Sequence, residues 1–154
     1  MKIAPHSCNK LCREAITTVE HRKPEGVKLY YTSEVDDCYE LITDGQRVCQ
    51  ILINFLTNAE KHTTQGEIRL HCSLTENPGY VTFSVTDTGT GIPPEYSETI
   101  FERFEKADSF GQGTGLGLNI CRLIAERLKG KVLLDKEYKE GARFVFVLPV
   151  KKSI

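Results

Sequence analysis

Two glycine-rich stretches constrain this chain more than any other feature of its sequence. The first reads DTGTG at residues 87–91, and the second reads GQGTGLGL at residues 111–118. Glycine lets a backbone come close to a ligand and adopt positive φ angles that side chains normally forbid. An apolar helical pattern opens directly after the second stretch, so unpaired N–H groups and the positive end of the helix dipole face the glycines. Phosphate is the usual occupant of such a position, and the pattern predicts a nucleotide pocket with a mobile cover.

The bulk composition is that of an ordinary soluble globular domain. The chain has 154 residues, of which 40% are hydrophobic and 27% are charged, and this length favours one domain. A formal net charge of −1 gives no sign of nucleic acid or an anionic membrane as a partner. The six cysteines include no C-x-x-C pair, so we expect reduced thiols in a cytosolic setting.

Apolar periodicity predicts a mixed order of helices and strands. Helices are expected at 11–20, from residue 43 or 44 onward, and at 115–128, and strands at 27–32, 67–75, 80–86, 131–135 and 143–148. An NPG turn between the second and third strands predicts a hairpin. The expected fold is a two-layer α/β (α+β) sandwich, in which a mixed, mostly antiparallel sheet of about five strands is covered on one face by about three helices.

Residues 88–113 show little regular pattern apart from one predicted turn of helix near 98–104. A long irregular segment inside a compact domain is usually functional, and we expect a flexible lid over the nucleotide. Phe101 and Phe104 either anchor the closed lid or belong to the core, and the sequence leaves both roles open. Lys106 beside them is a candidate for a contact with a terminal phosphate.

The helix expected after residue 44 carries amides and a cation on a different stripe from its apolar residues. Asn54, Asn58 and Lys61 are spaced four and then three residues apart, which is the spacing of one helix face. The amide oxygen of Asn58 can bind Mg²⁺, a hard cation that bridges phosphates, and Lys61 can meet phosphate charge. A single helical asparagine is more often a solvated surface residue, and the pairing with Asn54 is what favours a ligand site.

Asp87 ends an apolar strand immediately before the first glycines. A carboxylate there can accept a hydrogen bond from an exocyclic amine such as that of adenine, which would make the pocket selective for the base. An aspartate that only begins a tight turn explains the residue equally well by itself.

Four motifs then occur in an order that resembles sensor histidine kinases. NFLTNAEK at 54–61 looks like their N box, DTGTG at 87–91 like their first glycine box, FERFEK at 101–106 like their F box, and GTGLGL at 113–118 like their second glycine box. The similarity runs from about Val27 to the end of the chain. It implies an α/β sandwich that binds Mg²⁺ and ATP under a flexible lid and hands the γ-phosphoryl group to a histidine.

The resemblance also implies a set of site residues. ATP would be bound by members of these motifs and their neighbours: Asn54, Asn58, Lys61, His62, Asp87, Gly89, Gly91, Ile92, Phe104, Gly113, Thr114, Gly115, Leu116, Gly117 and Leu118. Asn58 would bind the metal, and Asn54, Lys61 and Lys106 would serve the transfer. His62 stands where the family usually has Phe or Tyr near the base, so we expect weaker base affinity that falls when the imidazole is protonated.

The acceptor histidine of the family is missing, since neither His6 nor His21 lies in a His-Glu or His-Asp context. Residues 1–20 are therefore expected to be a linker or the end of a dimerisation helix, and residues 21–154 the kinase-like domain. The implied partners are the dimerisation and phosphotransfer segment of a parent kinase and a downstream response regulator, with no nucleic acid and no direct membrane contact. We expect a cytoplasmic location, as the cytosolic part of a larger receptor.

Other functions stay open on the sequence alone. A nucleotide-sensing module that docks a partner without transferring phosphate would explain His62 and the missing acceptor. An anti-sigma-type serine kinase would have a similar length and fold, although the second glycine box matches the histidine kinase form better. ATP hydrolysis of the gyrase type is disfavoured, because those enzymes activate water with a glutamate where Asn54 stands, and an amide cannot act as a base.

Overall fold

In the residues that the structure describes, 1–102 and 116–150, five strands form the main sheet in the order β2-β4-β5-β7-β6. Strands β2 and β4 are parallel, and the other three neighbouring pairs are antiparallel. The predicted mixed, mostly antiparallel sheet is confirmed, and so is the hairpin of β4 and β5. The strands in the computed structural model are β2 (Val27–Ser33), β4 (Gly66–Ser73), β5 (Tyr80–Asp87), β6 (Lys131–Leu134) and β7 (Ala142–Pro149).

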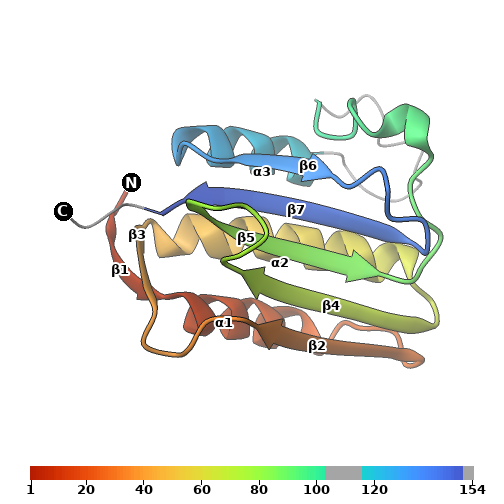
Figure 1. Cartoon of the computed structure of the whole chain (residues 1–154). Coiled ribbons are helices and arrows are strands. Elements are labelled where there is room, and N and C mark those ends of the chain that lie inside the picture. The colour runs from red at the N-terminus through yellow and green to blue at the C-terminus, as the bar shows by residue number, and fades with distance from the viewer. Residues whose placement is uncertain (103–115, 151–154) are drawn as a thin grey trace.

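Three α-helices of the described chain lie together on one face of this sheet (Figure 1). They are α1 (Cys8–Glu20), α2 (Gly45–His62) and α3 (Leu116–Arg127). The central helix, α2, packs against both of the others. It begins where expected, because the Asp44 side chain accepts a hydrogen bond from Arg47 N at 3.2 Å and so caps the first turn. The predicted two-layer sandwich is therefore confirmed.

The core lies between the helices and the sheet and is centred on aromatic rings. Phe55 on α2 contacts Phe144 on β7, with ring centroids 5.4 Å apart. Phe101 packs against both rings, at centroid distances of 6.5 and 5.9 Å. Phe101, for which the sequence left two roles open, is thus a core residue with 5% of its surface exposed. The apolar positions predicted for α2 are all buried: Val48, Ile51, Leu52, Phe55, Leu56 and Ala59.

Residues 4–20 form a short strand and a helix. β1 (Ala4–Ser7) pairs antiparallel with β3 (Glu40–Thr43) in a second, two-stranded sheet. α1 starts at a capped turn, in which the Ser7 side chain accepts from Lys10 N at 3.2 Å, and its buried residues join the main core: Leu11, Cys12, Ala15 and Val19. Helix α1 therefore packs against α2 and the β2–β4 side of the main sheet.

The described part of the expected lid is irregular but hydrogen-bonded. A short 3₁₀ helix, η1 (Pro94–Tyr96), is followed by turns in which Ile100 N donates to Tyr96 O at 2.8 Å and Glu102 N donates to Thr99 O at 2.9 Å. The helical turn expected near 98–104 thus begins a few residues earlier than predicted. The rest of the expected lid, from residue 103 onward, lies outside the described residues.

The six cysteines are free thiols, as predicted. Cys8, Cys12 and Cys72 are buried and act as small apolar members of the core. Within the described part of the chain, no helix combines the length and the apolarity that crossing a bilayer requires.

Replacing Leu11 by alanine tests whether α1 belongs to the core. Leu11 is 4% exposed, and Leu11→Ala is expected to lower the free energy of unfolding by about 2–5 kcal/mol through lost burial and a residual cavity. Thr17→Ala, at an exposed position of the same helix, is expected to change that free energy by less than about 0.5 kcal/mol. Urea denaturation followed by circular dichroism measures both variants. Equal and small effects would contradict the packing of α1.

Candidate functional site

One end of the sheet gathers the elements that carry the predicted motifs. The last turn of α2, the end of β5 and the loop between β6 and β7 lie on the right-hand side of Figure 1, and α3 begins nearer the middle of the view. The 3₁₀ helix η1 lies at the same end. Strand β5 runs toward this end and its antiparallel neighbour β7 starts from it, so segments far apart in the sequence meet there.

Asn54 and Gly117 join the amide-bearing face of α2 to the first turn of α3. Asn54 Nδ2 donates to the Gly117 carbonyl oxygen at 3.2 Å and to Cys121 Sγ at 3.6 Å. A Cβ on Gly117 would lie 3.6 Å from Asn54 Cγ, so the missing side chain keeps the space beside the amide open. Because the amide nitrogen serves α3, the carbonyl oxygen of Asn54 is the atom that can face a cation. The N box and the second glycine box are in direct contact.

Asn58 and Lys61 follow Asn54 by four and seven residues on α2. Asn58 is half-buried and Lys61 is exposed. A half-buried amide oxygen and an exposed ammonium on one helix face suit a hard cation and the charge of phosphate, respectively.

Asp87 is a buried carboxylate at the end of β5, with 1% of its surface exposed. Its Oδ1 accepts hydrogen bonds from the backbone N–H groups of Gly89 at 2.9 Å and Ala142 at 3.2 Å. Burial raises the pKa of Asp87, while these two N–H groups and the nearby His62 oppose that rise. The bond to Gly89 makes an Asx turn, so the turn-forming role expected as one alternative is present.

His62 ends α2 and packs its backbone against the first glycine box. Thr90 N donates to the His62 carbonyl oxygen at 3.0 Å, and a Cβ on Gly89 would overlap that same oxygen. Glycine is therefore required at residue 89 by the close approach of two backbone segments. The His62 imidazole is half-buried. Burial lowers its pKa, and the negative charge of Asp87 acts in the opposite direction.

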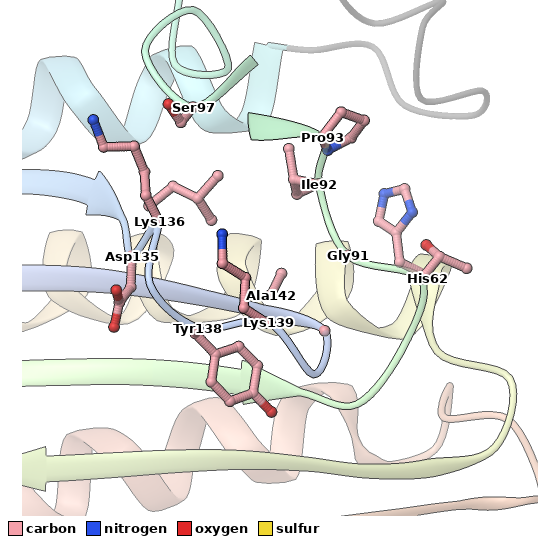
Figure 2. Close-up of a pocket in the computed structure, with 13 residues that line it drawn as sticks. His62, Gly91, Ile92, Pro93, Ser97, Asp135, Lys136, Tyr138, Lys139 and Ala142 are labelled. Carbon is pink, nitrogen blue, oxygen red and sulfur yellow. The ribbon is translucent and has the colours of Figure 1, made fainter. Parts of the chain in front are cut away.

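A pocket of about 620 Å³ opens beside these segments (Figure 2). Of the residues expected to bind ATP, His62, Gly91 and Ile92 line it. In Figure 2 they border the right side of the pocket, and the β6–β7 loop borders its left side. Gly91 has a φ of +78°, and a Cβ there would lie 3.0 Å from the Gly141 carbonyl oxygen. A side chain at residue 91 would be strained where the two walls approach each other.

The role of the β6–β7 loop, residues 135–141, is not predicted from the sequence. The loop supplies much of one pocket wall. Lys136 Nζ also lies 3.8 Å from Glu98 Oε2, which links the loop to the segment after η1. The one sequence signal is a glycine directly before the last strand, and it predicts a turn but no contact with a site. The loop residues that line the pocket are Asp135, Lys136, Tyr138, Lys139 and Gly141.

Some of the described residues expected to bind ATP do not line the pocket. Leu118 has its side chain buried in the core, so only its backbone can face a phosphate. α3 begins at Leu116, close to the start that the glycine motif predicts. The remaining members of the expected set lie outside the described residues: Phe104, Lys106, Gly113, Thr114 and Gly115.

The lowered pKa of His62 makes the stability of the fold depend on pH. Below the ordinary imidazole pKa of about 6.5, the unfolded chain binds a proton before the folded chain does, so the free energy of unfolding falls as the pH falls. Asp87, whose pKa is raised, acts in the opposite direction, in the more acidic range above the ordinary carboxyl pKa of about 3.9. We expect His62→Gln to flatten the loss of stability between about pH 7 and pH 5.5.

Denaturant titrations at a series of pH values measure this slope. His21→Gln, which replaces an exposed imidazole at the end of α1, is the matched control and should retain the slope of the unmodified chain. An unchanged slope in His62→Gln would contradict the burial of that imidazole.

Known proteins are similar to this chain in sequence and in fold. Residues 43–152 match the family model described as histidine kinase-, DNA gyrase B-, and HSP90-like ATPase. The autoinducer 2 sensor kinase/phosphatase LuxQ of Vibrio harveyi is 38% identical over 136 residues, which are 82% of this chain and 16% of LuxQ. The chain therefore spans less than a fifth of the curated relatives it matches.

Solved structures agree with the sequence matches. The catalytic domain of the histidine kinase ThkA superposes with a TM-score of 0.83 at 29% identity, covering 97% of this chain and 99% of that domain. ThkA has also been solved in complex with the response regulator protein TrrA. Full-length ShkA in complex with AMPPNP superposes with a TM-score of 0.85 at 32% identity, covering 99% of this chain and 32% of ShkA. The chain belongs to the family of histidine kinase-, DNA gyrase B- and HSP90-like ATPases, and within it to the histidine kinase catalytic domains.

Proposed function

We propose that this chain is the ATP-binding catalytic domain of a two-component sensor histidine kinase. In this proposal it binds Mg²⁺ and ATP and donates the γ-phosphoryl group to a histidine on a separate dimerisation segment. The observation that carries the proposal is the 3.2 Å contact between Asn54 and Gly117. It brings the amide face of α2 and the start of α3 together, and the pocket lies beside the C-terminal end of the same helix, α2.

The pocket fits a purine base near Asp87. Ile92, Leu134 and Ala142 contribute apolar atoms to its walls, and the imidazole of His62 can stack on a base. Asp87 offers a carboxylate that two backbone N–H groups already hold in place. Its second oxygen would accept from the exocyclic amine of adenine.

The amide face of α2 fits the triphosphate and its cation. The carbonyl oxygens of Asn54 and Asn58 are metal ligands of the kind that Mg²⁺ prefers. The Lys61 ammonium would meet the negative charge of the phosphates. Gly117 has no side chain beside Asn54, so the backbone N–H groups at the start of α3 could approach a phosphate. Bound Mg²⁺ would neutralise charge on the phosphates and on the leaving group.

The residues at the site favour phosphoryl transfer over hydrolysis. In transfer, an imidazole nitrogen of the acceptor attacks the γ-phosphorus, the bond from that phosphorus to the bridging oxygen breaks, and ADP leaves. Such a reaction needs positioning and charge neutralisation more than a strong base, which suits amides and a lysine. Asn54 cannot take a proton from water, and its nitrogen is engaged with Gly117 and Cys121. The roles of Phe104 and Lys106 in the lid rest on the motif resemblance alone.

The proposed partners are a dimerisation segment that carries the acceptor histidine and a response regulator that receives the phosphoryl group. The sensor kinase LuxQ and the ThkA complex with TrrA support this assignment by similarity. We place the domain in the cytosolic part of its parent kinase. Because α1 packs into the core and β1 pairs with β3, we propose that the domain includes residues 4–20.

Nucleotide binding and phosphoryl transfer are tested in two successive experiments. Calorimetry should detect ATP binding that requires Mg²⁺, and radiolabelled ATP should label the histidine of a dimerisation segment supplied in trans. Asn58→Ala is expected to lower the ATP affinity and the labelling rate by at least about tenfold, since an oxygen ligand of the cation is lost. Gln46→Ala, at an exposed amide of the same helix, is the matched control and should leave both unchanged.

The possible outcomes separate the candidate functions. No binding of ATP in the presence of Mg²⁺ would overturn the proposal altogether. Binding without label on any supplied histidine segment would favour a nucleotide-sensing module instead.

Gly117→Ala separates the stability of the fold from nucleotide binding. The added Cβ would meet Asn54 at 3.6 Å, which is an ordinary van der Waals contact. We expect the fold to be kept or stabilised by up to about 1 kcal/mol, because alanine favours the helix. The ATP affinity should fall about tenfold, because the methyl group fills space that a phosphate needs to approach the backbone. Thermal melting and calorimetry measure the two effects, and an unchanged ATP affinity would count against a phosphate site at α3.

A further inference from the structure

The β6–β7 loop reaches across the end of β5 and holds the backbone of Asp87. The Tyr138 hydroxyl donates a hydrogen bond to the Asp87 carbonyl oxygen at 3.2 Å. In Figure 2 the Tyr138 side chain extends from the loop toward the ribbon of β5. We propose that Tyr138 is a positioning residue that sets the base selectivity of the pocket through Asp87. This inference rests on the proposed function, in which Asp87 accepts from the adenine amine.

The loop is fastened at its beginning as well. Asp135 N donates to the Arg143 carbonyl oxygen at 2.9 Å, and Arg143 Nη1 lies 3.0 Å from Asp135 Oδ2. Glu137 N donates to the other oxygen of Asp135, also at 3.0 Å. The first residues of the loop therefore have a defined conformation. It presents Tyr138 to β5.

The end of the loop encloses the Asp87 carboxylate. A Cβ on Gly141 would overlap the Asp87 carbonyl oxygen, so the loop passes directly over that residue. Ala142 N donates to Asp87 Oδ1 at 3.2 Å, and Gly89 N donates to the same oxygen at 2.9 Å. The side chain of Asp87 is thus set by Gly89 and Ala142. Its backbone is paired with β4 and β7, and its carbonyl oxygen also accepts from the Tyr138 hydroxyl.

The position of the Asp87 carboxylate matters for base selectivity, because a hydrogen bond between a carboxylate and an amine is directional. Adenine carries an exocyclic amine that donates to a carboxylate, whereas hypoxanthine carries a carbonyl oxygen at the same ring position. A correctly placed Asp87 therefore favours ATP over ITP. A displaced Asp87 loses that preference, although both nucleotides keep their contacts with the cation and the phosphate site. The ratio of the two affinities reports the placement of Asp87.

Tyr138→Phe removes the hydroxyl and keeps the ring. Calorimetric titration of the chain with ATP and with ITP, each with Mg²⁺, measures the effect. We expect the ATP affinity to fall roughly three- to tenfold, the loss of one hydrogen bond, and the ITP affinity to stay nearly constant. The matched control is Tyr30→Phe, which removes a hydroxyl that donates to Glu67 Oε2 at 2.7 Å on the β2–β4 pair. It should leave the affinity ratio unchanged.

A double-mutant cycle tests whether Tyr138 acts through Asp87. Asp87→Asn alone should lower the ATP preference, and adding Tyr138→Phe should lower it no further, because coupled residues are not additive. An unchanged ratio in Tyr138→Phe, equal losses for ATP and ITP, or additive effects in the cycle would each overturn the inference while leaving the proposed function intact. Absence of ATP binding by the unmodified chain would overturn both.

Discussion

Burial of the apolar face of α2 against the sheet is the interaction on which the rest of this structure depends. Phe55 is fully buried and lies against Phe144 of β7 and against Phe101. A helix that buries one stripe of side chains presents its other stripes elsewhere. The packing that hides Phe55 therefore also turns Asn54 toward α3, where it bonds to Gly117. The helix ends at His62, which lines the pocket.

Asp87 shows how the site departs from what stability alone would favour. A carboxylate with 1% of its surface exposed carries a desolvation cost, and its raised pKa reflects that cost. Two backbone N–H groups offset part of it, and they come from opposite sides, one from the first glycine box and one from β7. A ligand amine would offset more. An apolar residue at this position would avoid the desolvation cost, but it would leave the N–H groups of Gly89 and Ala142 without this acceptor.

The sequence predicts those elements whose apolar pattern repeats over enough residues to be recognised. The apolar residues of α2 recur at helical spacing from Val48 to Ala59, over about three turns, and all of them are buried as expected. β1 has the sequence APHS, with no β-branched or aromatic residue to indicate a strand, and β3 pairs with β1 in the small sheet. The helix predicted at 11–20 is present in α1, but the sequence does not indicate what it packs against, since a short amphipathic helix can cover any apolar surface. The helical turn near Phe101 begins earlier than predicted, because a segment this short has no periodic pattern from which its start could be read.

What the sequence by itself determined is the inventory of the site: amides and a lysine on one helix face, a carboxylate at a strand end, and glycines where backbones must approach closely. Only the tertiary structure decided which distant segments meet. Asn54 and Gly117 are 63 residues apart, and Tyr138 and Asp87 are 51 apart. A periodic pattern records which face of an element is covered but carries no information about the segment that covers it. The wall formed by the β6–β7 loop has no periodicity at all, so its contact with Asp87 follows from strand order and register alone.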